Sequence, residues 1–334
     1  MRNTGYVCLA LSVGLIAGQQ ALSQRRTPRS ATRIELMTKG TSIEDIAFSA
    51  CGQMLASCDS ASRQVLVWSL KTNEVVKKRI DLPASPRALA FSASGRELAI
   101  ACGDKGYVLW DLVKDHCETH ELPGVCLCVK YSQDGSFLAA SCDNSVSVLN
   151  ARNGKPVITM RTESGSVTSI DFSPDSTRVA IASSHGDVVM YDAACKHVTS
   201  FSVSDQIRQI SFGPATDQLT IATLNSILIR DYARNKEIDR RGGFFFLTSF
   251  TVNQAENSIL ISTFAKTPRY YTYKWRENRL TCHALKSNAT AIRISPDAKS
   301  YAIGYGSPYG GDEANRTIGG LELWIKPSEM PASD

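Results

Sequence analysis

The chain has 334 residues, of which 43% are hydrophobic and 21% are charged, and this balance is typical of a folded globular protein. The composition excludes a disordered chain, a collagen-like chain and a polytopic membrane protein. At roughly 150 residues per domain, the length alone predicts about two domains. The net charge of +5 is spread along the chain without a basic stripe, so no nucleic-acid partner is expected.

Residues 1–23 have the features of a signal peptide. An apolar run extends from Val7 to Ala17, and Ala21 and Ser23 place small side chains before a cleavage site at Gln24. The run is too short to span a bilayer comfortably, because a transmembrane helix needs about 20 residues. This pattern predicts a secreted or periplasmic protein without stable membrane insertion, in which residues 24–32 form a linker.

Two other interpretations of the N-terminus stay open. No acidic residue precedes Glu35, and four arginines lie between Gln24 and that residue. An acid-free leader that carries arginines is also typical of a mitochondrial transit peptide, although the apolar block here is continuous where a transit peptide is amphipathic. An uncleaved leader would instead act as a signal anchor and tether the protein to a membrane.

A motif of about forty residues repeats seven times after the leader. In each copy, a landmark residue ends a short apolar run, and a hydrophobic residue follows it seven positions later. The landmarks are separated by 40 to 43 residues, and they are Phe48, Phe91, Tyr131, Phe172, Phe212, Val252 and Ile294. Seven copies with one offset indicate seven equivalent structural units.

Each unit is predicted to form four strands. The landmark run ends in turn residues such as Ser-Pro-Asp, and a strand of small residues follows, as in LAIAC or VAIAS. A tight turn then leads to a third strand with alternating hydrophobicity and to a more polar fourth strand. Four strands in about forty residues are typical of one propeller blade. We therefore predict an all-β fold, a single seven-bladed β-propeller over residues 33–326, in place of two domains.

The two ends of this region indicate how the ring closes. The last unit stops after its third strand, residues 321–325, and residues 33–37 (RIELM) have the pattern of an orphan fourth strand. Pairing this N-terminal strand with the C-terminal blade would close the ring and remove exposed sheet edges. Residues 327–334 are expected to be a disordered tail.

The units resemble WD40 repeats, and the resemblance covers about residues 33–326. Trp110-Asp111 is a literal WD dipeptide at the end of a third strand. No Gly-His dipeptide precedes any first strand, so the buried Asp–His–Ser/Thr–Trp network of that family is expected to be missing or incomplete. Degenerate versions of the dipeptide end the third strands of other units: Trp68-Ser69, Leu149-Asn150, Tyr191-Asp192, Arg230-Asp231 and Trp324-Ile325.

The histidines and cysteines of one stretch are the best candidate metal ligands, but the predicted strands separate them. Within thirteen residues lie the zinc-ligand types His116, Cys117, His120, Cys126 and Cys128. The histidines belong to the outer strand of one unit and the last two cysteines to the inner strand of the next. The width of a blade lies between these strands, so no metal site is expected.

Small side chains recur at one place in the repeat. Cys102 and Cys142 each follow their landmark by eleven residues, and Ser183, Thr223 and Thr263 hold the same place in other units. A buried cysteine behaves as a small hydrophobe, so packing between blades explains all five. Removing Cys8 with the leader leaves nine cysteines, and this odd number fits poorly with an oxidising compartment.

No catalytic motif is present: the sequence contains no G-x-S-x-G, no H-E-x-x-H and no P-loop. We therefore expect a non-catalytic, monomeric propeller that needs no cofactor and serves as a scaffold for protein partners. The alternative is an exported propeller enzyme, such as a lactonase-like or other hydrolase, or a small-ligand binder that uses the axial channel. Several acids converging at the channel mouth, or a bound metal, would favour the alternative, and an apolar or mixed flat rim would favour the scaffold.

Residues 304–320 form the first irregularity that could contact a partner. Thirty residues separate the landmark from the tryptophan position in this unit, against about 18 to 21 in the others. The insertion falls between the second and third strands, on the same side as the loops that link successive blades, and a tolerated surface insertion is the alternative. Its candidate partner-binding residues are Tyr305, Pro308, Tyr309, Asp312, Glu313 and Arg316.

The second irregularity is the segment RRGGFFF at residues 240–246. One or two of its phenylalanines are expected to line the first strand of the next blade. At least one is expected to be exposed, because successive residues of a strand point to opposite faces. Arg240, Arg241, Phe244 and Phe245 are therefore the second set of candidate partner-binding residues, and plain packing between blades is the alternative.

Overall fold

The computed structural model describes residues 32–36, 42–79, 81–192, 196–213, 217–306 and 320–326. All of them belong to the second of two compact units of the chain, Ala31–Asp334. The leader and the C-terminal tail anticipated from the sequence lie outside these ranges. Within them, no helix has the length and apolar character needed to cross a membrane.

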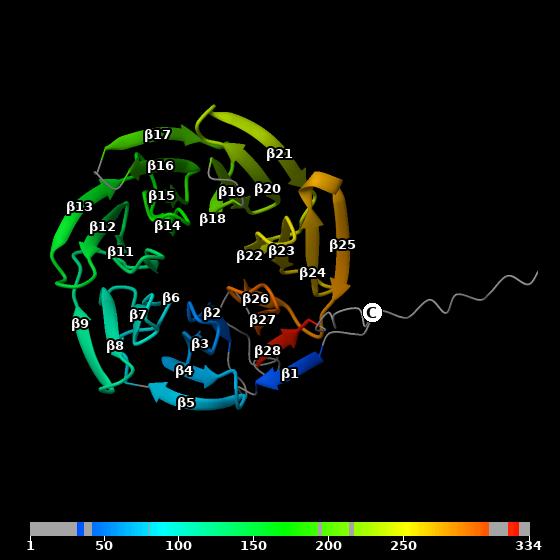
Figure 1. The fold of residues 1–334 in the computed structure, drawn as a ribbon. Helices are drawn as coiled ribbons and strands as arrows, with labels where there is room; N and C mark the ends of the chain where they lie inside the picture. The colour runs from blue at the N-terminus through cyan, green and yellow to red at the C-terminus, as the bar shows by residue number, and fades with distance from the viewer. Residues whose placement is uncertain are drawn as a thin grey trace, which may run out of the picture. The chain divides into compact units, whose positions relative to one another are not determined.

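The described residues contain 28 strands in seven four-stranded antiparallel sheets, which are arranged as blades around one axis (Figure 1). Blade 1 consists of β2 (Ile43–Phe48), β3 (Met54–Asp59), β4 (Gln64–Ser69) and β5 (Glu74–Arg79). Blade 2 consists of β6 (Ala88–Phe91), β7 (Glu97–Ala101), β8 (Tyr107–Asp111) and β9 (His116–His120). Blade 3 consists of β10 (Val129–Tyr131), β11 (Phe137–Cys142), β12 (Ser145–Asn150) and β13 (Pro156–Arg161). The all-β seven-bladed propeller predicted from the repeat is thereby confirmed.

Blades 4 to 7 follow the same order from the inner to the outer strand. Blade 4 consists of β14 (Val167–Phe172), β15 (Arg178–Ser183), β16 (Asp187–Asp192) and β17 (His197–Ser202), and blade 5 of β18 (Ile207–Phe212), β19 (Gln218–Thr223), β20 (Ser226–Asp231) and β21 (Lys236–Gly242). Blade 6 consists of β22 (Leu247–Asn253), β23 (Ser258–Thr263), β24 (Arg269–Lys274) and β25 (Arg279–Ala284). Blade 7 consists of β26 (Ala289–Ile294), β27 (Ser300–Tyr305), β28 (Gly320–Ile325) and β1 (Thr32–Leu36). One 3-10 helix, η1 (Trp275–Glu277), lies between β24 and β25.

Blade 7 combines strands from both ends of the propeller. Its outer strand is β1, which pairs antiparallel with β28, so that Thr32 lies opposite Ile325 and Leu36 opposite Leu321. Figure 1 shows β1, in blue, beside β28, in red. The free edges at the first and last repeats are thus paired with each other, as the two partial units of the sequence indicate.

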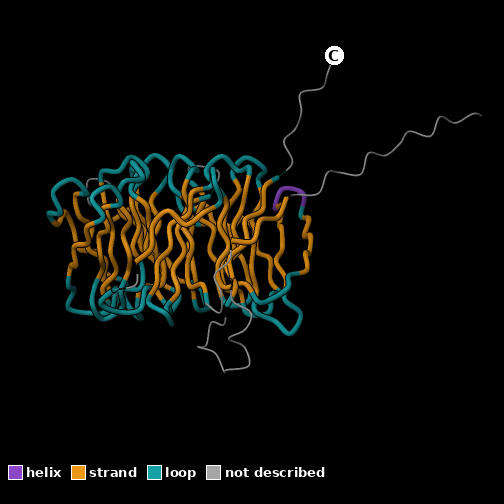
Figure 2. Tube along the Cα trace, turned by 90° about the horizontal axis from the view of Figure 1, so that it is seen from below, coloured by secondary structure: helices purple, strands orange, loops and turns teal. Residues whose placement is uncertain are grey.

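The loops form two layers, one at each end of the strands (Figure 2). One layer contains the loops between successive blades, for example residues 243–246, and the loops between second and third strands, for example residues 264–268; we call this side the connection face. The turns between the first and second strands and between the third and fourth strands lie on the opposite face. This division follows directly from the antiparallel order of the four strands.

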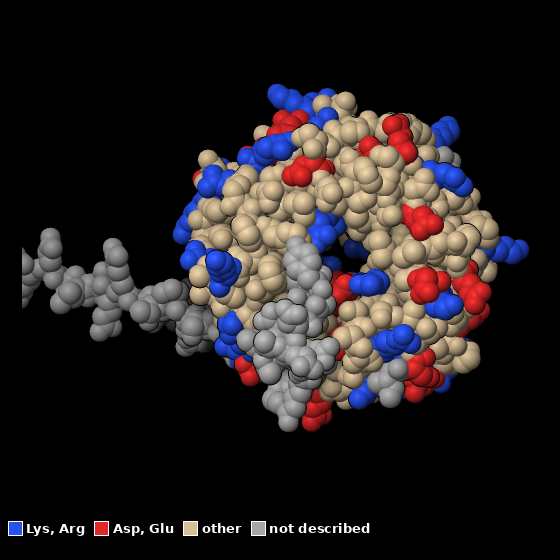
Figure 3. Space-filling model, turned by 180° about the vertical axis from the view of Figure 1, so that it is seen from behind, with Lys and Arg blue, Asp and Glu red and all other residues tan. Residues whose placement is uncertain are grey.

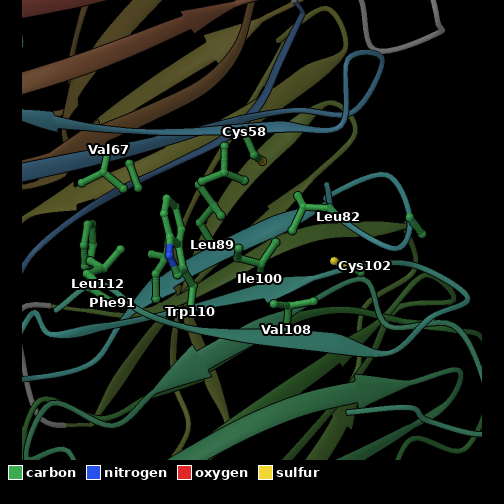
Figure 4. Close-up of a cluster of buried hydrophobic side chains, with 14 residues drawn as sticks. Cys58, Val67, Leu82, Leu89, Phe91, Ile100, Cys102, Val108, Trp110 and Leu112 are labelled. Atoms are coloured by element: carbon green, nitrogen blue, oxygen red, sulfur yellow. The ribbon is translucent and has the colours of Figure 1, made fainter. Parts of the chain in front are cut away.

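Apolar side chains fill the spaces between neighbouring blades. The cluster between blades 1 and 2 surrounds Trp110, which is fully buried and packs with Leu89, Phe91, Leu98 and Ile100 (Figure 4). The indole Nε1 of Trp110 donates a hydrogen bond of 2.9 Å to Asp115, in the turn after β8. The WD tryptophan is therefore satisfied locally, without the network that the WD40 family usually places there.

Inner strands carry a register irregularity near their first residues. In five blades the pairing with the second strand skips one residue, and the skipped residue begins the lining of the axial channel. A bulge of this kind changes the direction of a side chain relative to the regular pleat. The skipped residues are Glu44, Thr168, Arg208, Thr248 and Thr290.

Candidate functional site

The inner strands enclose an axial channel of about 1080 Å³. Three of its four lining arginines and lysines are paired with carboxylates: Arg87 with Glu44 at 3.2 Å, Lys130 with Asp171 at 3.0 Å, and Arg293 with Asp45 at 2.7 Å. Basic and acidic side chains are both visible around the opening of the channel (Figure 3). The charges of the channel therefore largely neutralise one another.

The channel acids also hold neighbouring blades together. Asp45 accepts a hydrogen bond of 3.0 Å from the backbone N–H of Leu89 in the next blade, and Asp171 accepts one of 2.8 Å from the N–H of Phe212. Gln209 bonds both to the N–H and to the carbonyl of Phe250 across the next seam. These polar groups complete the backbone hydrogen bonding of adjacent inner strands.

The candidate metal ligands do not converge. His116 and His120 lie on β9, and the ring of His120 stacks on Tyr107 with a centroid distance of 4.8 Å. Cys126 forms an isolated bridge with Gly103, and the thiol of Cys128 donates to the carbonyl of Thr168 at 3.0 Å. Among the described residues, no group of three or more histidines, cysteines and acids could hold a metal ion.

The cysteines and hydroxyls that share one place in the repeat are buried, as the sequence predicts. Their exposed fractions range from 0% to 8%. Burial raises the pKa of the Cys102 thiol to about 12, because a thiolate would lose its hydration there. A neutral thiol of this kind packs as an apolar group. These residues are Cys102, Cys142, Ser183, Thr223 and Thr263.

The three phenylalanines at residues 244–246 form the turn between blades 5 and 6. The first strand of blade 6 begins only at Leu247, so the expectation that one or two of them line this strand is wrong. Gly243 and Phe246 have φ values of 89° and 44°, and this left-handed backbone keeps the segment in a turn. A phenylalanine is a costly residue at such a φ, and the structure around it must hold it in place.

The turn separates its side chains by exposure. Phe244 is 5% exposed and meets Tyr271 edge to face at 5.4 Å, whereas Phe245 is 70% exposed. The prediction that at least one ring of the segment is exposed is therefore confirmed. Phe244, a candidate contact residue from the sequence, is instead buried and packs against Tyr271 under the turn.

Neighbouring loops hold Phe246 at the edge of this turn. The N–H of Phe264 donates to the carbonyl of Phe246 at 2.9 Å, and the two rings lie 6.4 Å apart. The guanidinium of Arg208, directed by the bulge in β18, lies 5.1 Å from the centre of the Phe246 ring. Among the described residues, no carboxylate lies within ion-pair distance of Arg208, unlike the three other channel cations.

Basic side chains predominate in this part of the connection face, although Asp205, in the loop before β18, lies close enough to Arg240 to act on its charge. Residues 224–226, 240–248 and 263–269 contain four charged side chains, all of them lysine or arginine. Arg240 is neutralised by Glu237 at 2.8 Å, at the far side of β21. We group the other basic side chains of these segments with Arg208 and the neighbouring phenylalanines under the name Arg–Phe patch. Its residues are Arg208, Arg241, Phe245, Phe246, Phe264, Lys266 and Arg269.

Of the candidate contact residues in the blade 7 insertion, only Tyr305 lies within the described residues. Tyr305 is fully buried at the end of β27, and its hydroxyl donates a hydrogen bond of 2.6 Å to Glu322, so its proposed role as a surface contact is corrected. The strand simply continues to this residue before the insertion begins. The other candidates, Pro308, Tyr309, Asp312, Glu313 and Arg316, lie outside the described residues.

Sequence reasoning missed the four members of the Arg–Phe patch that lie outside the RRGGFFF segment. Arg208, Phe264, Lys266 and Arg269 come from other strands and loops, and no local pattern connects them with that segment. The one available signal is positional: Arg208 lies four residues before its landmark, where three other units have threonine. Only the packing of blade 5 against blade 6 brings these residues together.

Comparisons with known proteins place this architecture in a family. A family model described as the DDB1- and CUL4-associated factor 12 beta propeller matches residues 43–243, which comprise the first five blades. The chain is also 25% identical to the meiotic recombination protein rec14 of Schizosaccharomyces pombe over 156 residues, 45% of this chain and 51% of that protein. The match thus spans about half the length of this curated relative. With the repeat, the ring and the matched blades in agreement, the chain belongs to the DDB1- and CUL4-associated factor 12 beta-propeller family.

Proposed function

We propose that the protein is a non-catalytic platform for other proteins and that a partner docks at the Arg–Phe patch. The observation that carries the proposal is Phe245, which is 70% exposed although large aromatic side chains usually find cover. An exposed aromatic ring next to arginines is the type of group that dominates the energy of protein interfaces. Its backbone is held by Phe244 beneath it, so little ordering is needed on binding.

The state of the channel supports a platform over an enzyme. A catalytic channel would hold acids with free oxygens aimed at a substrate. Here Asp45 and Asp171 use their oxygens for an ion pair and for a backbone N–H of the next blade. Their chemistry is directed to keeping the ring closed, and the mixed rim of paired charges is the arrangement expected of a scaffold.

The family supports the same conclusion. Its description names association with DDB1 and CUL4, and the name of the rec14 relative refers to meiotic recombination. We infer from the first of these names that assembly with other proteins is the shared role of such propellers. Which protein this chain binds is a matter for experiment, because the matched relative is covered over only about half of its length.

The first described strand begins on the face opposite to the Arg–Phe patch. β1 begins with Thr32 opposite Ile325, at the end of β28 away from the connection face. Phe245 lies on the connection face, in the turn that precedes β22. Thr32 and Phe245 therefore lie on opposite faces of the propeller.

Site-specific photo-crosslinking tests the docking surface directly. A benzoylphenylalanine replaces Phe245 in one variant and Val113 in a matched control, because both side chains are 70% exposed but Val113 lies in blade 2 on the opposite face. We expect protein adducts in cells at position 245 and none of the same mass at position 113.

A second pair of variants makes the result specific. In this second experiment the benzoylphenylalanine replaces a neighbouring residue such as Thr267. Phe245→Ala or Arg241→Gln in the same chain is expected to reduce the adduct yield, whereas Val113→Ala leaves it unchanged. Equal adducts at positions 245 and 113, or a yield indifferent to Phe245 and Arg241, would contradict docking at the Arg–Phe patch. Thermal unfolding of each variant confirms that the propeller is intact.

A further inference from the structure

The seam of the ring is a second surface with specific chemistry, independent of the Arg–Phe patch. β1 (Thr32–Leu36) contributes five residues to blade 7 and pairs with β28 alone. Its side chains alternate between two environments: Ile34 and Leu36 pack into the apolar cluster between blades 7 and 1, and Arg33 and Glu35 face the polar side of the sheet. β1 therefore binds the edge of β28 both through backbone hydrogen bonds and through side chains that alternate between apolar and charged.

A buried carboxylate lies at the centre of this edge. Glu322 on β28 is 1% exposed, and charged side chains are almost never buried to this extent without partners. Its oxygens accept hydrogen bonds from the hydroxyl of Tyr305 at 2.6 Å and from the indole of Trp324 at 3.1 Å. Arg33 of β1 lies 2.5 Å from Glu322, and Lys286, in the loop before β26, lies 2.8 Å from it.

Two cations bridge two carboxylates at this point. Glu35 lies directly opposite Glu322 in the strand register, where two like charges would repel each other. Lys286 and Arg33 each contact both carboxylates, at distances of 2.5 to 2.9 Å. Burial alone would lower the pKa of Lys286, but its hydrogen bonds to Glu322 and Glu35 hold it above the usual value. The site thus accepts a basic residue two positions before an acidic one.

The same site stays satisfied when β1 is absent. Glu322 would keep Lys286, Tyr305 and Trp324, all of which belong to the C-terminal end of the propeller. What departs with β1 is Arg33, two apolar side chains and one row of backbone hydrogen bonds. β1 pairs with one neighbouring strand, and its departure leaves no buried charge without a partner. Such an outer strand can detach while the rest of the blade stays folded.

From these contacts we propose that the edge of β28 is an exchangeable strand-acceptor site. β1 is its resident occupant, and an extended segment of a partner protein with the order basic, apolar, acidic, apolar can take its place. The basic side chain would meet Glu322 and the face of Trp324, which Arg33 now covers at 5.9 Å, and the acidic side chain would meet Lys286. Strand addition of this kind draws affinity from the backbone and specificity from alternate side chains.

A labelled peptide with the sequence of residues 31–37, ATRIELM, is the probe. Fluorescence anisotropy measures its binding to the full chain and to the Arg33→Gln variant, whose resident strand is weakened. Since the resident strand competes at a high effective concentration, we expect binding to the variant to be tighter than to the unaltered chain by about tenfold.

Two changes test the charges. A peptide with glutamine at the position of Arg33, and a chain that carries both Arg33→Gln and Glu322→Gln, should each weaken binding by about tenfold. The matched controls are Lys78→Gln on β5, the outer strand of blade 1, and a peptide of the β5 sequence, residues 73–79. The control variant should leave binding of the ATRIELM peptide unchanged, and the control peptide should not bind.

Mapping on the unaltered chain keeps the test valid even where a variant folds poorly. A photoreactive group at the position of Ile34 in the peptide should form adducts with residues of β28. No binding to either chain, equal binding of the β5 peptide, or adducts confined to other blades would overturn the proposal. None of these outcomes bears on Phe245, so the docking surface on the connection face is judged separately.

Discussion

Blades 2 and 7 share a topology but are stabilised in different ways. Blade 2 comes from one continuous segment, and its third strand places Trp110 in an apolar cluster, fully buried. Blade 7 combines strands from both ends of the propeller, and its equivalent tryptophan, Trp324, is only half-buried and stacks on Tyr301 beside a buried carboxylate. In the blade formed by a continuous segment, the buried tryptophan is packed mainly by apolar side chains. Where two distant segments must pair, charged groups are added to the apolar contacts.

The reason lies in strand register. A shift of one residue in a strand moves all of its side chains to the opposite face of the sheet. In a hairpin the turn fixes the register, as between β8 and β9, which only four residues separate. β1 and β28 have no such turn, and the pairing of Arg33 and Lys286 with Glu322 and Glu35 discriminates the correct register from its neighbours.

The largest expected effect is the loss of Trp110. Replacing it by alanine removes the fully buried indole from the cluster between blades 1 and 2, together with its hydrogen bond to Asp115. We expect a loss of about 3–5 kcal/mol in the free energy of unfolding. Urea denaturation measures it, with Lys114→Gln in the following turn, where the side chain is 79% exposed, as the control. A loss similar to that of the control would show that blade 2 does not depend on apolar packing.

A smaller effect is expected from the seam. Glu322→Gln leaves Arg33 and Lys286 without their buried counter-charge, and we expect a loss of about 1–2 kcal/mol, because both cations are partly exposed and water screens them. Salt should discriminate the two blades: 1 M salt reduces the Debye length to about 3 Å and should decrease the difference caused by Glu322→Gln, but not the one caused by Trp110→Ala. The same salt dependence for both variants would remove the contrast.

The smallest effect is the pH dependence of Glu35. Its hydrogen bond from Lys286, with the nearby charges of Lys286 and Arg33, holds its pKa below the usual value of 4.5. A carboxyl with a lowered pKa adds stability above its unfolded-state pKa, and this contribution is lost as the pH falls through the folded-state pKa. Glu35→Gln should therefore differ from the unaltered chain at about pH 7 and converge with it at about pH 3.

Unfolding midpoints over this pH range check the prediction for Glu35. Glu74→Gln on β5, an exposed outer-strand carboxyl of blade 1, is the matched control. A difference that stays constant with pH would show that Glu35 acts through packing and not through its charge.

Most of the fold is encoded locally and could be predicted. Six of the seven landmark residues end inner strands, and Val252 lies one residue before the end of β22. The small-residue runs after them form second strands, because alternating hydrophobicity and turn residues are properties of short segments. Trp110 could be assigned to a third strand for the same reason. The exposure of one phenylalanine in residues 244–246 was predicted from the alternation of side chains along a strand, whereas the structure exposes Phe245 in a turn.

The errors and omissions concern contacts between segments. Tyr305 was assigned to the surface because it begins a glycine-rich insertion, but β27 extends to it and Glu322 holds its hydroxyl. One or two of the phenylalanines at residues 244–246 were expected to line a strand, but positive φ values at Gly243 and Phe246 keep the segment in a turn. Arg208 could not be connected with Phe246, because a bulge in β18 directs it and bulges leave no clear trace in hydrophobicity.

The sequence by itself determined the number of blades, the order of strands in each blade and the two partial units that must pair. Only the tertiary structure decided which side chains gather at the connection face and at the seam. The physical reason is distance along the chain. A repeat is specified within about forty residues, whereas Arg33 and Glu322 are 289 positions apart and meet only when seven blades have closed into a ring.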